Sequence, residues 1–136
     1  MKMAIGGHGL VRLAVAASLG ICCHGATAGG FALIEQNADL VMQVLCAADI
    51  EAAKAAGKIG IVYGFQNAVG LEGDPRLVKV FHSLGVRIIQ LTYMTANVLG
   101  DGCLEPRNGG LTVFGKAVVR ELNKHKIIVD LSHVGE

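Results

Sequence analysis

The feature that most constrains the fold is a series of short apolar runs that alternate with helical stretches. Three of the runs end in polar residues, namely Gln66-Asn67, Thr92-Tyr93 and Ser132-His133. Strands that are buried on both faces of a parallel sheet read as nearly continuous runs of Val, Ile and Leu. In (β/α) barrels the chemistry collects where such strands end. The pattern therefore predicts parallel strands that carry functional side chains at one rim.

The alternation of strands and helices continues from residue 40 to residue 131. Apolar runs predict strands at 40–45, 59–63, 86–92 and 126–131, and helical spacing predicts helices at 47–56, 74–84 and 112–124. Asp74-Pro75 is typical of a helix start, Thr112 is a suitable N-cap, and His82 is expected on an outer helix face. Connections of this length favour parallel strands in an α/β fold.

Four strands are fewer than a closed barrel needs. A (β/α) barrel has eight strand–helix units and about 250 residues, whereas this chain has 136. We therefore expect a partial (β/α) TIM-type barrel that is incomplete at both ends, and an open doubly wound sheet is the alternative that fits the length. Either arrangement leaves sheet edges uncovered, which predicts poor solubility or a homo-oligomer formed through those edges.

The composition argues against several classes of partner. Twelve basic and eleven acidic residues leave a net charge of +1, and aromatic residues make up 4% of the chain with no Trp. A nucleic-acid-binding surface needs a basic patch or stacking aromatic side chains, so we expect no nucleic-acid partner. A hydrophobic content of 52% supplies enough apolar surface for a core.

The first thirty residues have the features of an export signal. Lys2 and Arg12 precede an apolar run from Leu13 to Cys23, and Ala26-Thr27-Ala28 provides small residues for cleavage. The run is about half the roughly twenty residues that cross a bilayer, so no transmembrane span is expected. Residues 1–30 are thus a signal peptide or a segment unrelated to the rest. The first alternative predicts a periplasmic protein and the second a cytoplasmic one.

The cysteines show no C-x-x-C spacing. They stand at Cys22, Cys23, Cys46 and Cys103, and we expect free thiols. His133 is different, because it closes an apolar run and its ring nitrogen can bind a metal, with Asp130 or a backbone carbonyl fixing the tautomer.

Several motifs in the second half of the chain resemble those of the renal or membrane dipeptidase family. They are Gly57-Lys58-Ile59-Gly60, Leu84-Gly85-Val86-Arg87, Gly110-Leu111-Thr112 with Phe114-Gly115, and the run 129–134. The resemblance extends from about residue 39 to residue 136. It implies that residues 31–136 form a partial dipeptidase-like (β/α) barrel domain.

The resemblance also implies a zinc metallopeptidase that acts on dipeptide-like small substrates. Members of the family hold two metal ions with histidines and carboxylates, bridged by a glutamate. His133 lies at the position of a metal-binding histidine in the family's Asp-Leu-Ser-His motif. Gln66 lies at the position of the bridging glutamate, and Tyr93 at that of a histidine that contacts the substrate carbonyl.

Departures from the family pattern predict an incomplete site. A neutral amide such as Gln66 offsets the charge of two cations poorly compared with a carboxylate. The family's opening His-x-Asp pair has no counterpart, since His8 is followed by Gly9-Leu10. The family's next histidine ligand and its late aspartate also find no match. We therefore expect a truncated, inactive fragment of a dipeptidase-like metallohydrolase.

Two other functions fit the sequence. The first is a non-catalytic α/β module that associates with itself through its sheet edges. The second is a small nucleotide-binding domain, which only scattered glycines favour, because no acidic residue stands at the spacing of a ribose contact.

Overall fold

The computed structural model describes residues 2–3, 11–17 and 32–135. The chain divides into two compact units, residues 1–16 with 22–63 and residues 17–21 with 64–136. Most of the predicted export signal, together with His8, Cys22 and Cys23, lies outside the described residues. Within those residues, no helix combines the length and the apolar character needed to cross a membrane.

The first unit contains a parallel strand pair followed by an alanine-rich helix. Strand β3 (Val41–Gln43) pairs with β4 (Ile59–Phe65) in parallel. The connecting helix α2 (Ala47–Ala55) buries Ala53. At its start, the Asp49 carboxylate accepts hydrogen bonds from the backbone amides of residues 45 and 46 at 2.8 and 2.9 Å. Strands β1 (Lys2–Met3) and β2 (Val11–Ala17) pair antiparallel.

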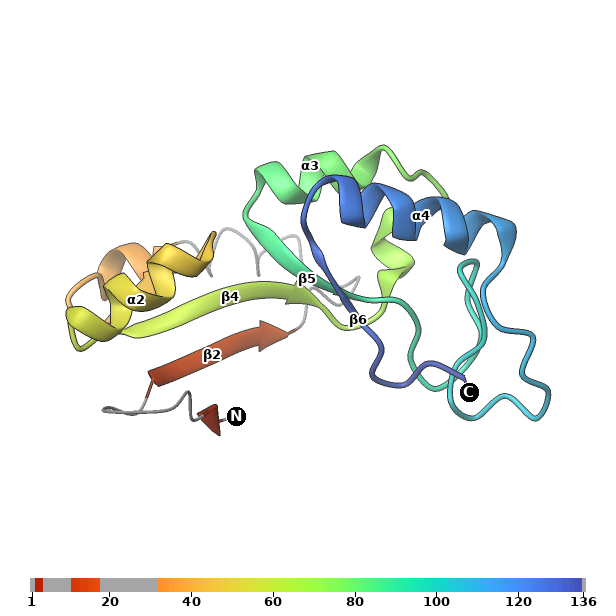
Figure 1. Ribbon diagram of the computed structural model, residues 1–136, viewed down its shortest axis with the longest axis horizontal. Helices are drawn as coiled ribbons and strands as arrows, with labels where there is room; N and C mark the ends of the chain where they lie inside the picture. Colours follow the sequence, from red (N-terminus) through yellow and green to blue (C-terminus); the bar gives the residue numbers. More distant parts are fainter. Residues whose placement is uncertain (1, 4–10, 18–31, 136) are drawn as a thin grey trace. The chain divides into compact units, whose positions relative to one another are not determined.

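The second unit is a strand–helix layer. Strand β5 (Val86–Gln90) pairs in parallel with β6 (Ile128–Asp130). Helices α3 (Leu77–Ser83) and α4 (Val113–Lys124) lie side by side on one face of these strands (Figure 1). A short 3-10 helix, η1 (Ala68–Leu71), follows the end of β4.

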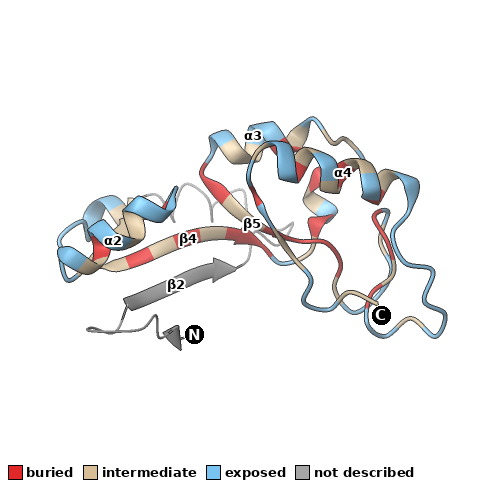
Figure 2. Ribbon diagram, viewed as in Figure 1, coloured by how far each residue is buried: buried red, intermediate tan, exposed pale blue. Residues whose placement is uncertain are grey.

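The core of the second unit lies between its strands and helices. Figure 2 shows buried segments along β5 and on the inner sides of α3 and α4. The largest fully buried side chains all belong to this unit: Leu71, Ile89, Leu91, Leu99, Leu122, Val78, Val118 and Thr92. Helix α4 contacts this core through a narrow stripe, and Gly115 in that stripe has no room for a side chain because a Cβ would collide with the Leu99 carbonyl.

The predicted strand–helix order is confirmed, with one difference at a helix start. Thr112 caps α4, because its hydroxyl accepts a hydrogen bond from the Gly115 amide at 2.9 Å. Helix α3 begins at Leu77 and not at Asp74-Pro75. Asp74-Pro75 leads into the helix through a tight turn: the Asp74 carbonyl accepts a hydrogen bond from the Leu77 amide at 3.2 Å, and the Asp74 carboxylate accepts one from the Arg76 amide at 2.8 Å, as an N-cap acid does.

His82, which was predicted on an outer helix face, is less exposed than that prediction implies. His82 is half-buried, and its ring centre lies 5.7 Å from that of His125, the C-cap residue of α4. Burial lowers the pKa of His82 below its usual value of 6.5, and the charges of Arg87 and His125 lower it further. The ring therefore belongs to the contact between α3 and α4.

Candidate functional site

The ends of β5 and β6 bring two predicted site residues together. The two parallel strands are in register at Gln90 and Asp130, and Tyr93 and His133 each follow three residues later. Their ring centres lie 4.4 Å apart, with the planes inclined by 52°. Tyr93 is half-buried and His133 is exposed, so an imidazole and a phenol share the rim of the second unit.

Two buried polar side chains hold the segment that carries His133. Gln90 and Thr92 are 3% and 1% exposed. The Gln90 amide nitrogen donates to the Ser132 carbonyl at 2.7 Å, and the Thr92 hydroxyl donates to the His133 carbonyl at 3.1 Å. His133 has a φ of +61°, a conformation that persists only where the surroundings fix it. The two hydrogen bonds supply part of that restraint.

The loop after β5 is tied to the end of β4 by Asn97. Its side-chain nitrogen donates to the Leu91 carbonyl and to the Asn67 side-chain oxygen, both at 2.8 Å. Its side-chain oxygen accepts a hydrogen bond from the Leu99 amide at 2.7 Å. Asn67 directly follows Gln66, so the same network fixes the backbone beside that predicted ligand.

Cys103 is a neighbour of His133 that the sequence did not indicate. The Cys103 Sγ atom lies 3.6 Å from the His133 Nδ1 atom. Thirty residues separate the two side chains, and no spacing motif links them. The adjacent Gly102 is the one local signal, because a glycine permits close approach of two backbones.

Other predicted features of the site have mixed outcomes. The sequence predicted that Asp130 or a backbone carbonyl fixes the His133 tautomer, and this stays a prediction; the Asp130 carboxylate accepts a hydrogen bond from the Ser132 amide at 2.8 Å. Gln66 lies one residue beyond β4 and is exposed. Across residues 2–3, 11–17 and 32–135, no hydrogen bond or ring contact joins Gln66 to Tyr93 or His133. Its convergence with them stays a prediction.

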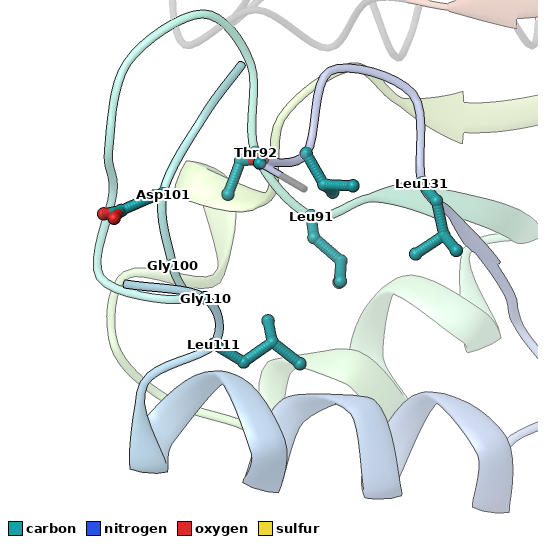
Figure 3. Close-up of a pocket in the computed structure, with 9 residues that line it drawn as sticks. Leu91, Thr92, Gly100, Asp101, Gly110, Leu111 and Leu131 are labelled. Atoms are coloured by element: carbon teal, nitrogen blue, oxygen red, sulfur yellow. The ribbon is translucent and has the colours of Figure 1, made fainter. Parts of the chain in front are cut away.

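A small apolar pocket is lined by segments that flank Tyr93 and His133 in the sequence, and neither ring lines it. It has a volume of about 120 Å³ and includes Thr92 and Val134, the chain neighbours of Tyr93 and His133. Figure 3 shows the side chains of Leu91, Leu111 and Leu131 pointing into the same space, while the Asp101 carboxylate points away from it. The pocket has room for a small apolar group.

Metal-binding side chains are sparse in the part of the chain that the structure describes. Within it, no three His, Cys, Asp or Glu side chains form a group that holds a metal ion. Of the two predicted ligands, His133 and Gln66, the His133 imidazole is the better one, since neutral imidazole is a common metal ligand. The candidate site therefore consists of an imidazole, a phenol and their buried hydrogen-bonded supports.

Comparison with known proteins identifies similar sequences. The family model described as membrane dipeptidase (peptidase family M19) matches residues 31–136. A dipeptidase of Aspergillus oryzae is 38% identical over 79 residues, which are 57% of this chain and 19% of that protein. A dipeptidase of Claviceps purpurea is 31% identical over 106 residues, 76% of this chain and 25% of that protein. The chain thus spans about a fifth to a quarter of these relatives.

Solved structures give the same result. An amidohydrolase from Pseudomonas aeruginosa is similar with a TM-score of 0.83 and 43% identity, covering 91% of this chain and 38% of that one. A metallo peptidase from Rhodobacter sphaeroides, liganded with a phosphinate mimic of the dipeptide L-Ala-D-Ala, is similar with a TM-score of 0.71 and 30% identity, covering 80% and 33%. The predicted fold, an α/β arrangement of parallel strands that is part of a TIM-type barrel, is confirmed.

Proposed function

The chain belongs to the membrane dipeptidase family, peptidase family M19, and from this premise we propose that its β5–β6 rim forms part of a metallohydrolase site for dipeptides or related amides. The observation that carries the proposal is the 4.4 Å contact between Tyr93 and His133. Active sites of (β/α) barrels lie at the carboxyl ends of the strands, and both rings stand there.

The family is a metallopeptidase family, and one residue at the rim, His133, suits zinc as the metal. His133 is exposed and follows a parallel strand, and imidazole nitrogen is a preferred zinc ligand. We propose His133 as a metal ligand and Gln66 as a weaker oxygen ligand at the position of the family's bridging glutamate. Zinc, when bound, supplies a Lewis acid for peptide hydrolysis.

Tyr93 is the residue that we propose to contact the substrate. Its phenol can donate a hydrogen bond to a carbonyl oxygen, as a donor that stabilises developing negative charge does. The pocket of about 120 Å³, which is lined by the neighbouring residue Thr92, suits a small apolar side chain of a dipeptide. Support for this substrate class comes from the similar Rhodobacter sphaeroides protein, which binds a dipeptide mimic.

Metal binding by the purified 136-residue chain tests the proposal. We expect weak zinc binding in equilibrium dialysis, lost in His133→Ala and kept in His125→Gln, a control histidine that directly follows α4. Zinc binding that His133→Ala leaves unchanged would contradict the role of His133.

Dipeptide turnover by the same chain is a separate measurement. We expect none, because hydrolysis needs an activated water, a base and an electrophilic clamp together, and the described rim offers one imidazole and one phenol. Turnover that a chelator and His133→Ala both abolish would show that the chain is catalytically sufficient.

A second candidate function is self-association without catalysis. Large apolar side chains are exposed on β6, directly after it and at the start of α4, with exposed fractions of 59% for Ile128, 64% for Leu131 and 86% for Val113. Exposed apolar side chains on an edge strand favour pairing with another copy. Light scattering then returns an oligomer, which Ile128→Lys dissociates. A well-folded monomer of the unaltered chain would count against this function.

A further inference from the structure

The contact between Cys103 and His133 is the feature that the proposed function leaves unused. The sulfur and Nδ1 lie 3.6 Å apart, and both residues are exposed. A metal ion in solution can therefore reach both donor atoms.

The backbone around Cys103 is held to both strand ends. The Cys103 amide is shared between the Tyr93 carbonyl at 3.3 Å and the His133 carbonyl at 3.0 Å, and the Leu104 amide donates to the Met94 carbonyl at 2.9 Å. Gly102 permits this approach, because a Cβ there would collide with the Tyr93 carbonyl. Backbone hydrogen bonds therefore hold the main chain of Cys103 against that of His133.

The sulfur-to-nitrogen distance matches that of two ligands on one metal ion. A tetrahedral zinc with Zn–S of about 2.3 Å and Zn–N of about 2.0–2.1 Å holds its sulfur and nitrogen ligands about 3.5 Å apart. We propose that Cys103 is a metal ligand that binds a zinc-type divalent ion together with His133. This inference rests on the proposed role of His133 as a metal ligand.

A thiolate would supply the negatively charged ligand that the described part of this site lacks. On binding, the thiol releases its proton to solvent and the sulfur shares a lone pair with the metal. The thiolate brings a negative charge, which the neutral amide of Gln66 does not. A Cys–His pair also favours zinc over the harder cations magnesium and calcium, which prefer oxygen ligands.

Cobalt(II) titration of the full chain, kept reduced, tests the proposal with a readout other than activity. We expect a thiolate-to-cobalt charge-transfer band in the near ultraviolet, present in Cys46→Ser and lost in Cys103→Ser. Cys46 is the matched control, because it is the other exposed free thiol in the described residues. The zinc dissociation constant of Cys103→Ser is expected to rise by more than the roughly 10–100-fold that loss of an outer-shell partner causes.

The outcomes separate this inference from the proposed function. Cobalt binding that needs His133 but shows no charge-transfer band overturns the role of Cys103 and leaves the proposed function standing. A band that survives Cys103→Ser arises from other thiols and also overturns it. Metal binding that is indifferent to His133→Ala overturns both.

Discussion

The two units of the chain contain the same kind of element but are stabilised differently. In the first, α2 is rich in alanine and buries only Ala53. In the second, α4 buries Gly115, Val118 and Leu122 along one stripe. The difference shows two ways in which a helix between strands is stabilised. Helix α2 depends on the high helix propensity of alanine, and α4 depends on the burial of an apolar stripe.

The second unit is also where the candidate site lies, and its core explains why. Leu91 and Leu99, both fully buried, lie on either side of the segment that carries Tyr93. Rim side chains are held in productive positions only if the elements beneath them are well packed. The contrast between the units therefore predicts which substitutions affect stability and the site together.

The largest effect is expected from the core of α4. Leu122 is 0% exposed, so Leu122→Ala should lower the free energy of unfolding by about 2–5 kcal/mol through lost burial and a cavity. Val113→Ala on the same helix, where Val113 is 86% exposed, is the control and should change it little. Urea unfolding measures both. If the two substitutions lowered the free energy of unfolding equally, the buried stripe of α4 would not be what stabilises the second unit.

An intermediate effect is expected at the helix starts. Thr112→Ala removes the cap of α4 and should cost about 1 kcal/mol, while Thr112→Ser should restore most of it. Asp49→Ala at α2 should reduce helical circular dichroism with less change in global unfolding, because α2 contributes little to a core. If Asp49→Ala destabilised the chain more than Thr112→Ala, the first unit would be the more important one for stability.

The smallest effect is expected from pH. Burial, Arg87 and His125 lower the pKa of His82 below 6.5. As the pH falls below about 6.5, the unfolded chain binds the proton first. The free energy of unfolding therefore falls with pH in this range and levels off below the folded-state pKa. His82→Gln should flatten this slope, and His133→Gln should keep it, in urea titrations across the range.

Sequence reasoning predicted the second unit well where local rules apply. The strands containing Val86 and Ile128 and the Thr112 cap are observed near their predicted positions. Helix α3 begins later than predicted because the chain from Asp74 to Leu77 forms a tighter turn, in which the Leu77 amide donates to the Asp74 carbonyl. Such a tightening is a difference in backbone dihedral angles that a sequence pattern does not contain.

In the candidate site, too, some features were predicted from local sequence patterns and others were not. Tyr93 and His133 were predicted to share a rim because parallel strands end at one edge, and the structure places them together. Gln90 was not singled out, and Thr92 was noted only as a polar strand end, since a polar residue in or after an apolar run does not reveal its hydrogen-bond partner. Their partners lie more than forty positions along the chain.

The sequence by itself determined the order of strands and helices, the parallel α/β class and the family, because apolar periodicity and motif order are local properties of the chain. Only the tertiary structure decided that Cys103 lies against His133 and that His82 faces His125. Those contacts depend on how a long loop crosses two strand ends and how two helices pack. Both are set by backbone hydrogen bonds and close approach between residues distant in the sequence.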